Sequence, residues 1–145
     1  MKILAQRVSE ASVTINQACH SAIDRGLLLL IGVEKGDSEA CCAKLAKKIL
    51  AYRMFADDQG KMNLNVEQIS GSILAVSQFT LAADTEKGLR PGFSAAASPD
   101  RAKELYEYFV RCLKQSSIEI KTGVFAADMK VALINDGPVT FLLEA

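Results

Sequence analysis

The segment Ser77-Gln78-Phe79-Thr80 is the first place in the sequence where polar side chains could act on a substrate. It directly follows the apolar residues 73–76, which are typical of a buried strand. Successive side chains of a strand point to opposite faces, so Gln78 and Thr80 would share one face. If the chain bends there, backbone N–H groups converge on a carbonyl oxygen and favour acyl transfer. The alternative is structural, since these hydroxyls also satisfy backbone groups where a strand ends.

A second polar cluster, Asn135-Asp136-Gly137-Pro138, lies near the C-terminus. Asn and Asp tolerate a positive φ, Gly adopts one freely and Pro fixes its own φ, so this composition is typical of a tight turn. Apolar residues flank the cluster over 131–134 and 139–143. The pattern predicts a hairpin with this turn at its tip, and by composition alone the turn needs no further role.

The histidine and the cysteines predict no catalytic or metal site. His20 is the only histidine, lies between two predicted strands, and has no spacing that ties it to a serine, cysteine or carboxylate cluster, which argues against a histidine-based triad. The four cysteines have no paired metal spacing and are expected to be reduced and mostly buried; they are Cys19, Cys41, Cys42 and Cys112. We expect neither a metal nor a cofactor.

The composition predicts one soluble cytoplasmic domain over residues 1–145. Half of the 145 residues are hydrophobic, which suffices for a sizeable core. We find no signal peptide and no apolar run near the roughly 20 residues of a membrane helix, so no membrane partner is expected. With 17 basic and 17 acidic side chains, bulk electrostatic binding of nucleic acid is disfavoured. Local contacts, or merely a solvated surface, remain open for Arg7, Lys44, Lys47, Lys48, Lys87 and Arg90.

The elements that would position the polar clusters form an α+β pattern. Strands are predicted over 3–8, 12–15 and 26–33, the last one central and buried on both faces. One amphipathic helix should begin at Asp37 or Ser38 and end near Tyr52, and a second should begin at Ser98 with Pro99 in its first turn. A long loop, 82–97, lies between strand and helix. We expect a barrel-like, mostly antiparallel sheet with the two amphipathic helices packed outside.

Six segments in order resemble the bacterial D-aminoacyl-tRNA deacylase family, historically called D-tyrosyl-tRNA deacylase, over essentially the whole chain. They are Gln6-Arg7-Val8 with Ala11-Ser12-Val13, Gly32-Val33-Glu34-Lys35, Gly60-Lys61-Met62-Asn63-Leu64, Ser77-Gln78-Phe79-Thr80-Leu81, Ala127-Asp128-Met129, and Asn135-Asp136-Gly137-Pro138-Val139-Thr140. One departure is Gly92-Phe93-Ser94 after Pro91, where the family usually has Ser-Phe-Ser.

The resemblance implies hydrolysis of the ester bond of D-aminoacyl-tRNA by a homodimer. The family's Gly-Pro turn, here Gly137 and Pro138, has a cis peptide bond and reaches into the partner subunit's pocket. Its carbonyl groups would leave room for a hydrogen or a D side chain but none for an L side chain. The same logic explains why achiral glycine would pass. The expected partner is the 3′ aminoacyl-adenosine end of tRNA, and DNA is not expected.

The resemblance also assigns the pocket. Its centre is the segment from Ser77 to Thr80, and Phe125 and Met129 match positions that line it. Thr80 is a nucleophile candidate without an adjacent base, so we favour backbone N–H groups near Phe79 and Thr80 as the carbonyl-binding groups, with help from the terminal 2′-hydroxyl of the tRNA. The alternatives are a tRNA-end binding module without catalysis and a structural dimer without an RNA role.

Overall fold

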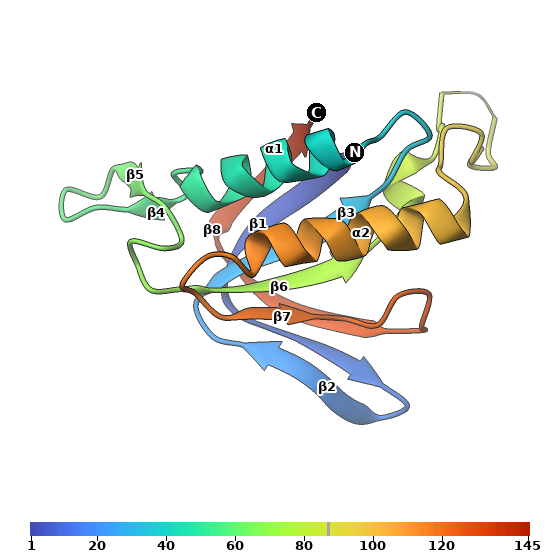
Figure 1. Ribbon diagram of the computed structural model, residues 1–145. Coiled ribbons are helices and arrows are strands. Elements are labelled where there is room, and N and C mark those ends of the chain that lie inside the picture. Colours follow the sequence, from blue (N-terminus) through green and yellow to red (C-terminus); the bar gives the residue numbers. More distant parts are fainter. Residues whose placement is uncertain (87) are drawn as a thin grey trace.

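A computed structural model, which describes residues 1–86 and 88–145, has an α+β fold with one six-stranded, barrel-like sheet beside two helices (Figure 1). The strands of this sheet are β1 (Lys2–Ile15), β2 (Ala18–Ile23), β3 (Gly26–Gly32), β6 (Ser72–Ser77), β7 (Ile120–Thr122) and β8 (Lys130–Glu144). The helices are α1 (Glu39–Ala51) and α2 (Pro99–Leu113). A separate ribbon pairs β4 (Phe55–Ala56) with β5 (Met62–Leu64), and a 3₁₀ turn, η1 (Phe79–Ala82), follows β6.

The order of the sheet explains its mostly antiparallel character, which the sequence predicted. The strands run β2-β1-β3-β6-β7, and β8 also pairs with β1. β1 is antiparallel to β2, β3 and β8, whereas β3–β6 and β6–β7 are parallel. Because parallel strands need a crossover, α1 and α2 lie in the connections β3–β6 and β6–β7 and cover the same side of the sheet (Figure 1).

β2 and β7 bring the two ends of the sheet close together. The Ser21 hydroxyl in β2 donates to the carbonyl of Thr122 in β7 at 2.9 Å. The Lys121 ammonium of β7 donates to the carbonyl of Ala22 at 2.7 Å. These side-chain hydrogen bonds join β2 to β7 where these two described strands form no backbone pairing, so the barrel is nearly closed.

The central strand β3 is buried on both faces, as the sequence predicted for residues 26–33. Leu27, Leu29 and Ile31 of β3 belong to the core between the sheet and the helices. Leu28 points the other way and packs with Leu74 in a second core inside the barrel. Strand alternation therefore divides one continuous apolar run between two cores.

Both predicted helices are confirmed. Ser38 is the N-cap of α1, and its hydroxyl accepts a hydrogen bond from the Cys41 amide at 3.3 Å. Pro99 occupies the first turn of α2, although Ser98 makes no side-chain capping bond. The predicted apolar stripe of α2 is buried; it consists of Ala102, Leu105, Tyr106, Phe109 and Leu113.

The N-terminal strands differ from the prediction. Residues 3–8 and 12–15 belong to the single strand β1, and the hairpin to β2 was missed. The chain reverses at Asn16 and Gln17, both with positive φ (49° and 65°), which is the two-residue turn that suits the twist of a hairpin. Sequence reasoning missed it because this turn lacks glycine. His20, expected between strands, lies exposed within β2.

The predicted C-terminal hairpin is wrong. Residues 130–144 form one strand, β8, that runs antiparallel to β1 over nearly its whole length. The register steps from Gln6↔Thr140 to Val8↔Asn135. Arg7 alone therefore stands opposite residues 136–139, so the polar cluster is a large β-bulge and not a chain reversal.

The prediction that the cysteines are mostly buried is only partly confirmed. Of the four cysteines, only Cys42 is buried, Cys41 and Cys112 are half-buried and Cys19 is exposed; all four are free thiols. Burial raises the pKa of the Cys42 thiol to about 12, so it stays protonated. Over residues 1–86 and 88–145, no helix is long and apolar enough to span a membrane, and no cluster of metal-ligating side chains is found.

Candidate active site

A cavity of about 490 Å³ opens where the parallel strands β3 and β6 end. Its walls come from these strand ends, from the start of α2 and from the loop that precedes β8. The lining residues are Ile31, Val33, Val76, Ser77, Gln78, Phe79, Ala97, Pro99, Ala102, Tyr106, Phe125, Ala126, Ala127, Asp128, Met129 and Val131. Ligands commonly bind at the carboxyl ends of parallel strands, where the loops leave the sheet.

The structure brings five of the eight predicted site residues together in this cavity. They are Ser77, Gln78, Phe79, Phe125 and Met129. Thr80 is exposed beside the cavity and does not line it. Gly137 and Pro138 lie in the bulge of β8, also outside the cavity of their own chain.

The backbone at the end of β6 leaves two amides available. The Gln78 amide donates to the Ile31 carbonyl at 2.8 Å, and the Leu81 amide donates to the Gln78 carbonyl at 3.2 Å. Between them, the amides of Phe79 and Thr80 have no hydrogen-bond acceptor among the described residues, as expected for the first turn of a helix. Two adjacent N–H groups therefore remain free to bind an oxygen just after β6, where Phe79 lines the cavity.

The hydroxyl of Thr80 contacts an amide and not a base. Gln78 Nε2 donates a hydrogen bond to Thr80 Oγ1 at 2.5 Å. A hydroxyl nucleophile normally needs a group that accepts its proton, and an amide N–H donor cannot do so. The arrangement orients the Thr80 side chain without activating it.

Tyr106 is a cavity residue that sequence reasoning treated only as core. Its hydroxyl donates to the Ala75 carbonyl at 2.9 Å, and its ring lies 6.0 Å from that of Phe125. Burial raises the pKa of Tyr106 above the ordinary tyrosine value, so its hydroxyl stays protonated at neutral pH. Tyr106 therefore lines the cavity as a neutral phenol whose proton is engaged by the Ala75 carbonyl, so it is not a base. Its place in an apolar stripe gave no signal of this contact.

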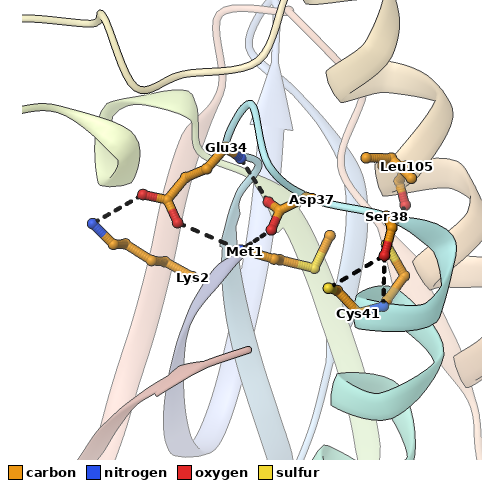
Figure 2. Close-up of polar contacts among 8 residues, drawn as sticks. Met1, Lys2, Glu34, Asp37, Ser38, Cys41 and Leu105 are labelled. Atoms are coloured by element: carbon orange, nitrogen blue, oxygen red, sulfur yellow. Dashed lines mark hydrogen bonds and ion pairs between the residues drawn. The ribbon is translucent and has the colours of Figure 1, made fainter.

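A polar cluster fixes the loop after β3 (Figure 2). Val33, at the start of this loop, lines the cavity. The α-ammonium of Met1, whose side chain is buried, pairs with the Asp37 carboxylate and lies 3.4 Å from Glu34 Oε2. Asp37 Oδ2 also accepts from the Glu34 amide at 2.7 Å. On the far side of this loop, the Ala97 amide donates to the Val33 carbonyl at 3.1 Å. The cluster thus supports two lining residues, Val33 and Ala97.

Arg7 holds the bulge of β8 from the opposite strand. Its Nε donates to the Asp136 carbonyl at 2.7 Å, and its Nη1 donates to the Met54 carbonyl at 2.8 Å. The Asp136 carboxylate lies 3.8 Å from Arg7 Nε. Arg7 therefore links the start of the bulge to the segment that precedes β4. Of the other candidate basic residues, Lys44, Lys47, Lys48 and Arg90 are exposed, and Lys87 lies outside the described residues.

Asn135 closes the bulge and Gly137 gives it its shape. Asn135 Oδ1 accepts from the Val139 amide at 2.7 Å, and Asn135 Nδ2 donates to Thr140 Oγ1 at 2.9 Å. Gly137 has φ +147°, and a Cβ there would lie only 2.7 Å from Val139 Cγ2. The Gly137–Pro138 peptide bond is cis, as the resemblance implied, and both residues are exposed. The bulge is thus exposed and is held by hydrogen bonds of Arg7 and Asn135.

Comparison with known proteins agrees with this architecture. The family model described as "D-Tyr-tRNA(Tyr) deacylase" matches residues 4–144. A "D-aminoacyl-tRNA deacylase" of Saccharophagus degradans is 61% identical over 143 residues, and one of Photobacterium profundum is 60% identical over 144 residues; each match covers 99% of both chains.

Two solved structures share the fold. One, "c-Myc DNA Unwinding Element Binding Protein", has a TM-score of 0.95 and 40% identity, covering 100% of this chain and 99% of the other. The second, "Structural Analysis of a probable eukaryotic D-amino acid tRNA deacylase", has a TM-score of 0.84 at 14% identity, covering 99% and 98%. At that identity, the second match shows the fold alone.

The fold and the matches place the chain in a class of hydrolases, the deacylases. Within that class, the chain belongs to the D-Tyr-tRNA(Tyr) deacylase family.

Proposed function

We propose that this chain hydrolyses the ester bond of D-aminoacyl-tRNA in the cytoplasm, releasing tRNA and the D-amino acid, as a step of translation quality control. The observation that carries the proposal is the pair of free amides, Phe79 and Thr80, at the mouth of a cavity in a chain of this family. Hydrolysis of an activated ester needs a site for the negative charge that develops on the carbonyl oxygen. Two adjacent N–H donors provide such a site.

The mechanism relies on positioning and not on a protein nucleophile. The amides of Phe79 and Thr80 bind the carbonyl oxygen of the ester, and the 2′-hydroxyl of the terminal adenosine directs water to the carbonyl carbon. An aminoacyl ester is already a reactive acyl donor, so orientation and charge stabilisation suffice. Among the described cavity residues, Tyr106 is held protonated, which leaves no phenolate to act as a base.

Thr80→Ala tests this mechanism. The substitution removes the hydroxyl but keeps the backbone amide, so we expect the variant to hydrolyse D-tyrosyl-tRNA at a rate within about threefold of the wild-type rate. Thr80→Pro is the matched variant, because proline removes the amide hydrogen at the same position. It should lose activity, with circular dichroism as the check on its fold. A near-complete loss in folded Thr80→Ala would support a nucleophilic hydroxyl instead.

The proposed active unit is a homodimer in which each subunit's bulge enters the cavity of the other. Gly137 and Pro138 are exposed and lie outside the cavity of their own chain, so a role at the site requires a second copy. β8 pairs only with β1 among the described strands, and its outer edge is therefore available. Ile134 and Leu142 of this strand are 54% and 55% exposed, and a partner subunit would cover them.

Selectivity is proposed to come from exclusion by the partner's bulge. Main-chain carbonyl groups of Gly137 and Pro138, placed against the α-carbon of the substrate, leave room for hydrogen and not for an L side chain. Such a device accepts many D residues because it makes few contacts with the D side chain. The same geometry admits glycyl-tRNA as a slower or equal substrate, since glycine has no side chain to exclude.

A mixed dimer tests both proposals at once. One subunit has Gly137→Ala, which alters the bulge, and the other has Ala127→Trp, which fills the cavity. In the mixed dimer the only open cavity faces an unaltered bulge of the other subunit. We expect it to hydrolyse D-tyrosyl-tRNA and to reject L-tyrosyl-tRNA, unlike the Gly137→Ala homodimer. Equal loss of selectivity in the mixed and Gly137→Ala dimers would place the bulge's action in its own subunit, and a monomeric wild type would end the proposal.

The competing function is a module that grips the end of tRNA without cleaving it. Such a module would protect D-aminoacyl-tRNA from spontaneous hydrolysis, whereas an enzyme accelerates that hydrolysis. A DNA-binding role has been named for one structural relative. In this chain 17 acidic side chains balance 17 basic ones, which gives no support for binding of duplex DNA by charge.

A further inference from the structure

Two phenylalanine rings are exposed together at the mouth of the cavity. The rings of Phe79 and Phe93 have centroids 5.0 Å apart and are tilted by 45°. Their exposed fractions are 62% and 39%. Phe79 lines the cavity, whereas Phe93 does not, so the pair extends from the cavity edge onto the outer surface. Large aromatic rings usually bury most of their area, and an exposed pair beside a binding site indicates a ligand that covers it.

The loop that presents Phe93 is anchored on both sides. The amide of Asp84 donates to the Gly92 carbonyl at 2.7 Å, and the amide of Gly92 donates to the Asp84 carbonyl at 2.9 Å. On the other side, the Lys35 amide donates to the Ala95 carbonyl at 2.9 Å, and within the loop the Ala96 amide donates to the Phe93 carbonyl at 3.1 Å. The backbone of Phe93 is thus held next to the cavity.

The unusual glycine before Phe93 does not alter this arrangement. A Cβ at Gly92 would meet nothing closer than 3.8 Å, and both bonds to Asp84 use only the backbone. The serine that the family usually has would fit the same bridge. The loop geometry around Phe93 therefore does not depend on the departure from the family pattern.

We propose that the Phe79–Phe93 pair is a stacking platform for the base of the nucleotide that precedes the terminal adenosine of tRNA. The inference rests on the proposed function, because it takes the ester of that adenosine to lie at the amides of Phe79 and Thr80. Unpaired bases are commonly recognised by stacking on aromatic rings. Phe93 is the ring outside the cavity, so it meets the part of the RNA that leaves the cavity and not the aminoacyl group.

Phe93→Trp measures the stacking directly. The chain has no tryptophan, so this variant has a single tryptophan reporter on the platform. Uncharged tRNA with its complete 3′ end should quench the fluorescence of this tryptophan. The same tRNA without its last two nucleotides should not. Equal quenching by both RNAs, or by neither, would overturn the proposal, and neither result depends on catalysis.

Phe93→Ala separates binding from chemistry. With D-tyrosyl-tRNA, we expect KM to rise about tenfold or more, the range for loss of a base-stacking ring, while kcat stays unchanged. With D-tyrosyl-adenosine, which lacks the preceding nucleotide, both constants should match the wild type. Phe93→Tyr, which keeps the ring, should restore the wild-type KM. Leu89→Ala is the matched control, because Leu89 is a fully exposed apolar residue of the same loop.

The outcomes separate this inference from the proposed function. A wild-type chain that does not hydrolyse D-tyrosyl-tRNA would end the proposed function, but the fluorescence titration would still report on stacking. An unchanged KM for Phe93→Ala with tRNA would overturn the platform while leaving the deacylase intact. An equal rise in KM for D-tyrosyl-adenosine would also overturn it. A change in the oligomeric state of Phe93→Ala, measured by sedimentation, would assign the ring to subunit contacts instead.

Discussion

Arg7→Met should convert the deacylase from a selective enzyme into a less selective one. Methionine keeps the apolar stem of the arginine but removes the guanidinium that holds the bulge. Two hydrogen bonds are lost, one to the carbonyl of Asp136 at 2.7 Å and one to the carbonyl of Met54 at 2.8 Å. The bulge that contains Gly137 and Pro138 then keeps only the Asn135 hydrogen bonds and the pairing with β1 on either side, so it becomes more mobile.

The expected loss of stability follows from where these two carbonyls lie. Hydrogen bonds from a charged donor contribute about 1.5–3 kcal/mol each. The bond to Met54 is partly buried and should contribute in this range, whereas the bond to Asp136 is exposed and water replaces much of it. The ion pair with the Asp136 carboxylate is also exposed and contributes little. We expect a total loss of about 2 kcal/mol, or a fall in Tm of about 4–8 °C for a domain of this size.

The assay compares hydrolysis of D- and L-tyrosyl-tRNA by Arg7→Met with the spontaneous rates. The cavity residues are unchanged, so hydrolysis of the D substrate should continue, and hydrolysis of the L substrate should rise clearly above its spontaneous rate. Arg53→Met, which removes an exposed guanidinium, should change neither Tm nor selectivity. If Arg7→Met loses stability as expected but still rejects the L substrate fully, the position of the bulge does not depend on Arg7.

Three further substitutions test other parts of the site. Gly137→Ala places a Cβ 2.7 Å from Val139 Cγ2, so we expect a loss of about 1–3 kcal/mol in urea unfolding and increased hydrolysis of L-tyrosyl-tRNA. Tyr106→Phe should leave the pH–rate profile unchanged. Because burial raises the pKa of Tyr106 in the folded chain, the wild type should lose folding stability through this group as pH rises above about 10, and Tyr106→Phe should not show that loss. Asp37→Asn removes the carboxylate charge that pairs with the Met1 ammonium, whereas Glu34 Oε2 stays 3.4 Å away, so urea unfolding should show a loss of about 1.5–3 kcal/mol.

The helices and central strands could be predicted because local signals and packing agree. Ser38 and Pro99 mark helix starts, and the apolar run around Leu28 has the length and composition of a buried strand. The C-terminal region could not be predicted, because turn residues serve equally in a reversal and in a bulge. Only the length of β1, which pairs with β8 on both sides of Arg7, decides between the two.

Only some of the cavity residues could be predicted from the sequence. The segment around Ser77 was found because polar residues follow a buried strand. Tyr106 looked like core, since a single buried face of α2 both fills the core and lines the cavity floor. The exposure of Phe93 depends on how its loop is anchored at Asp84, which no local pattern reveals. Side chains that act through tertiary contacts were therefore the ones missed.

The most direct test of the account is the hydrolysis of matched D- and L-tyrosyl-tRNA by the purified wild-type chain, measured against the rate without protein. We expect D-tyrosyl-tRNA to be deacylated much faster than it hydrolyses spontaneously, while L-tyrosyl-tRNA decays at its spontaneous rate. Acceleration of both substrates would contradict the proposed role of the bulge, and acceleration of neither would contradict the proposed function.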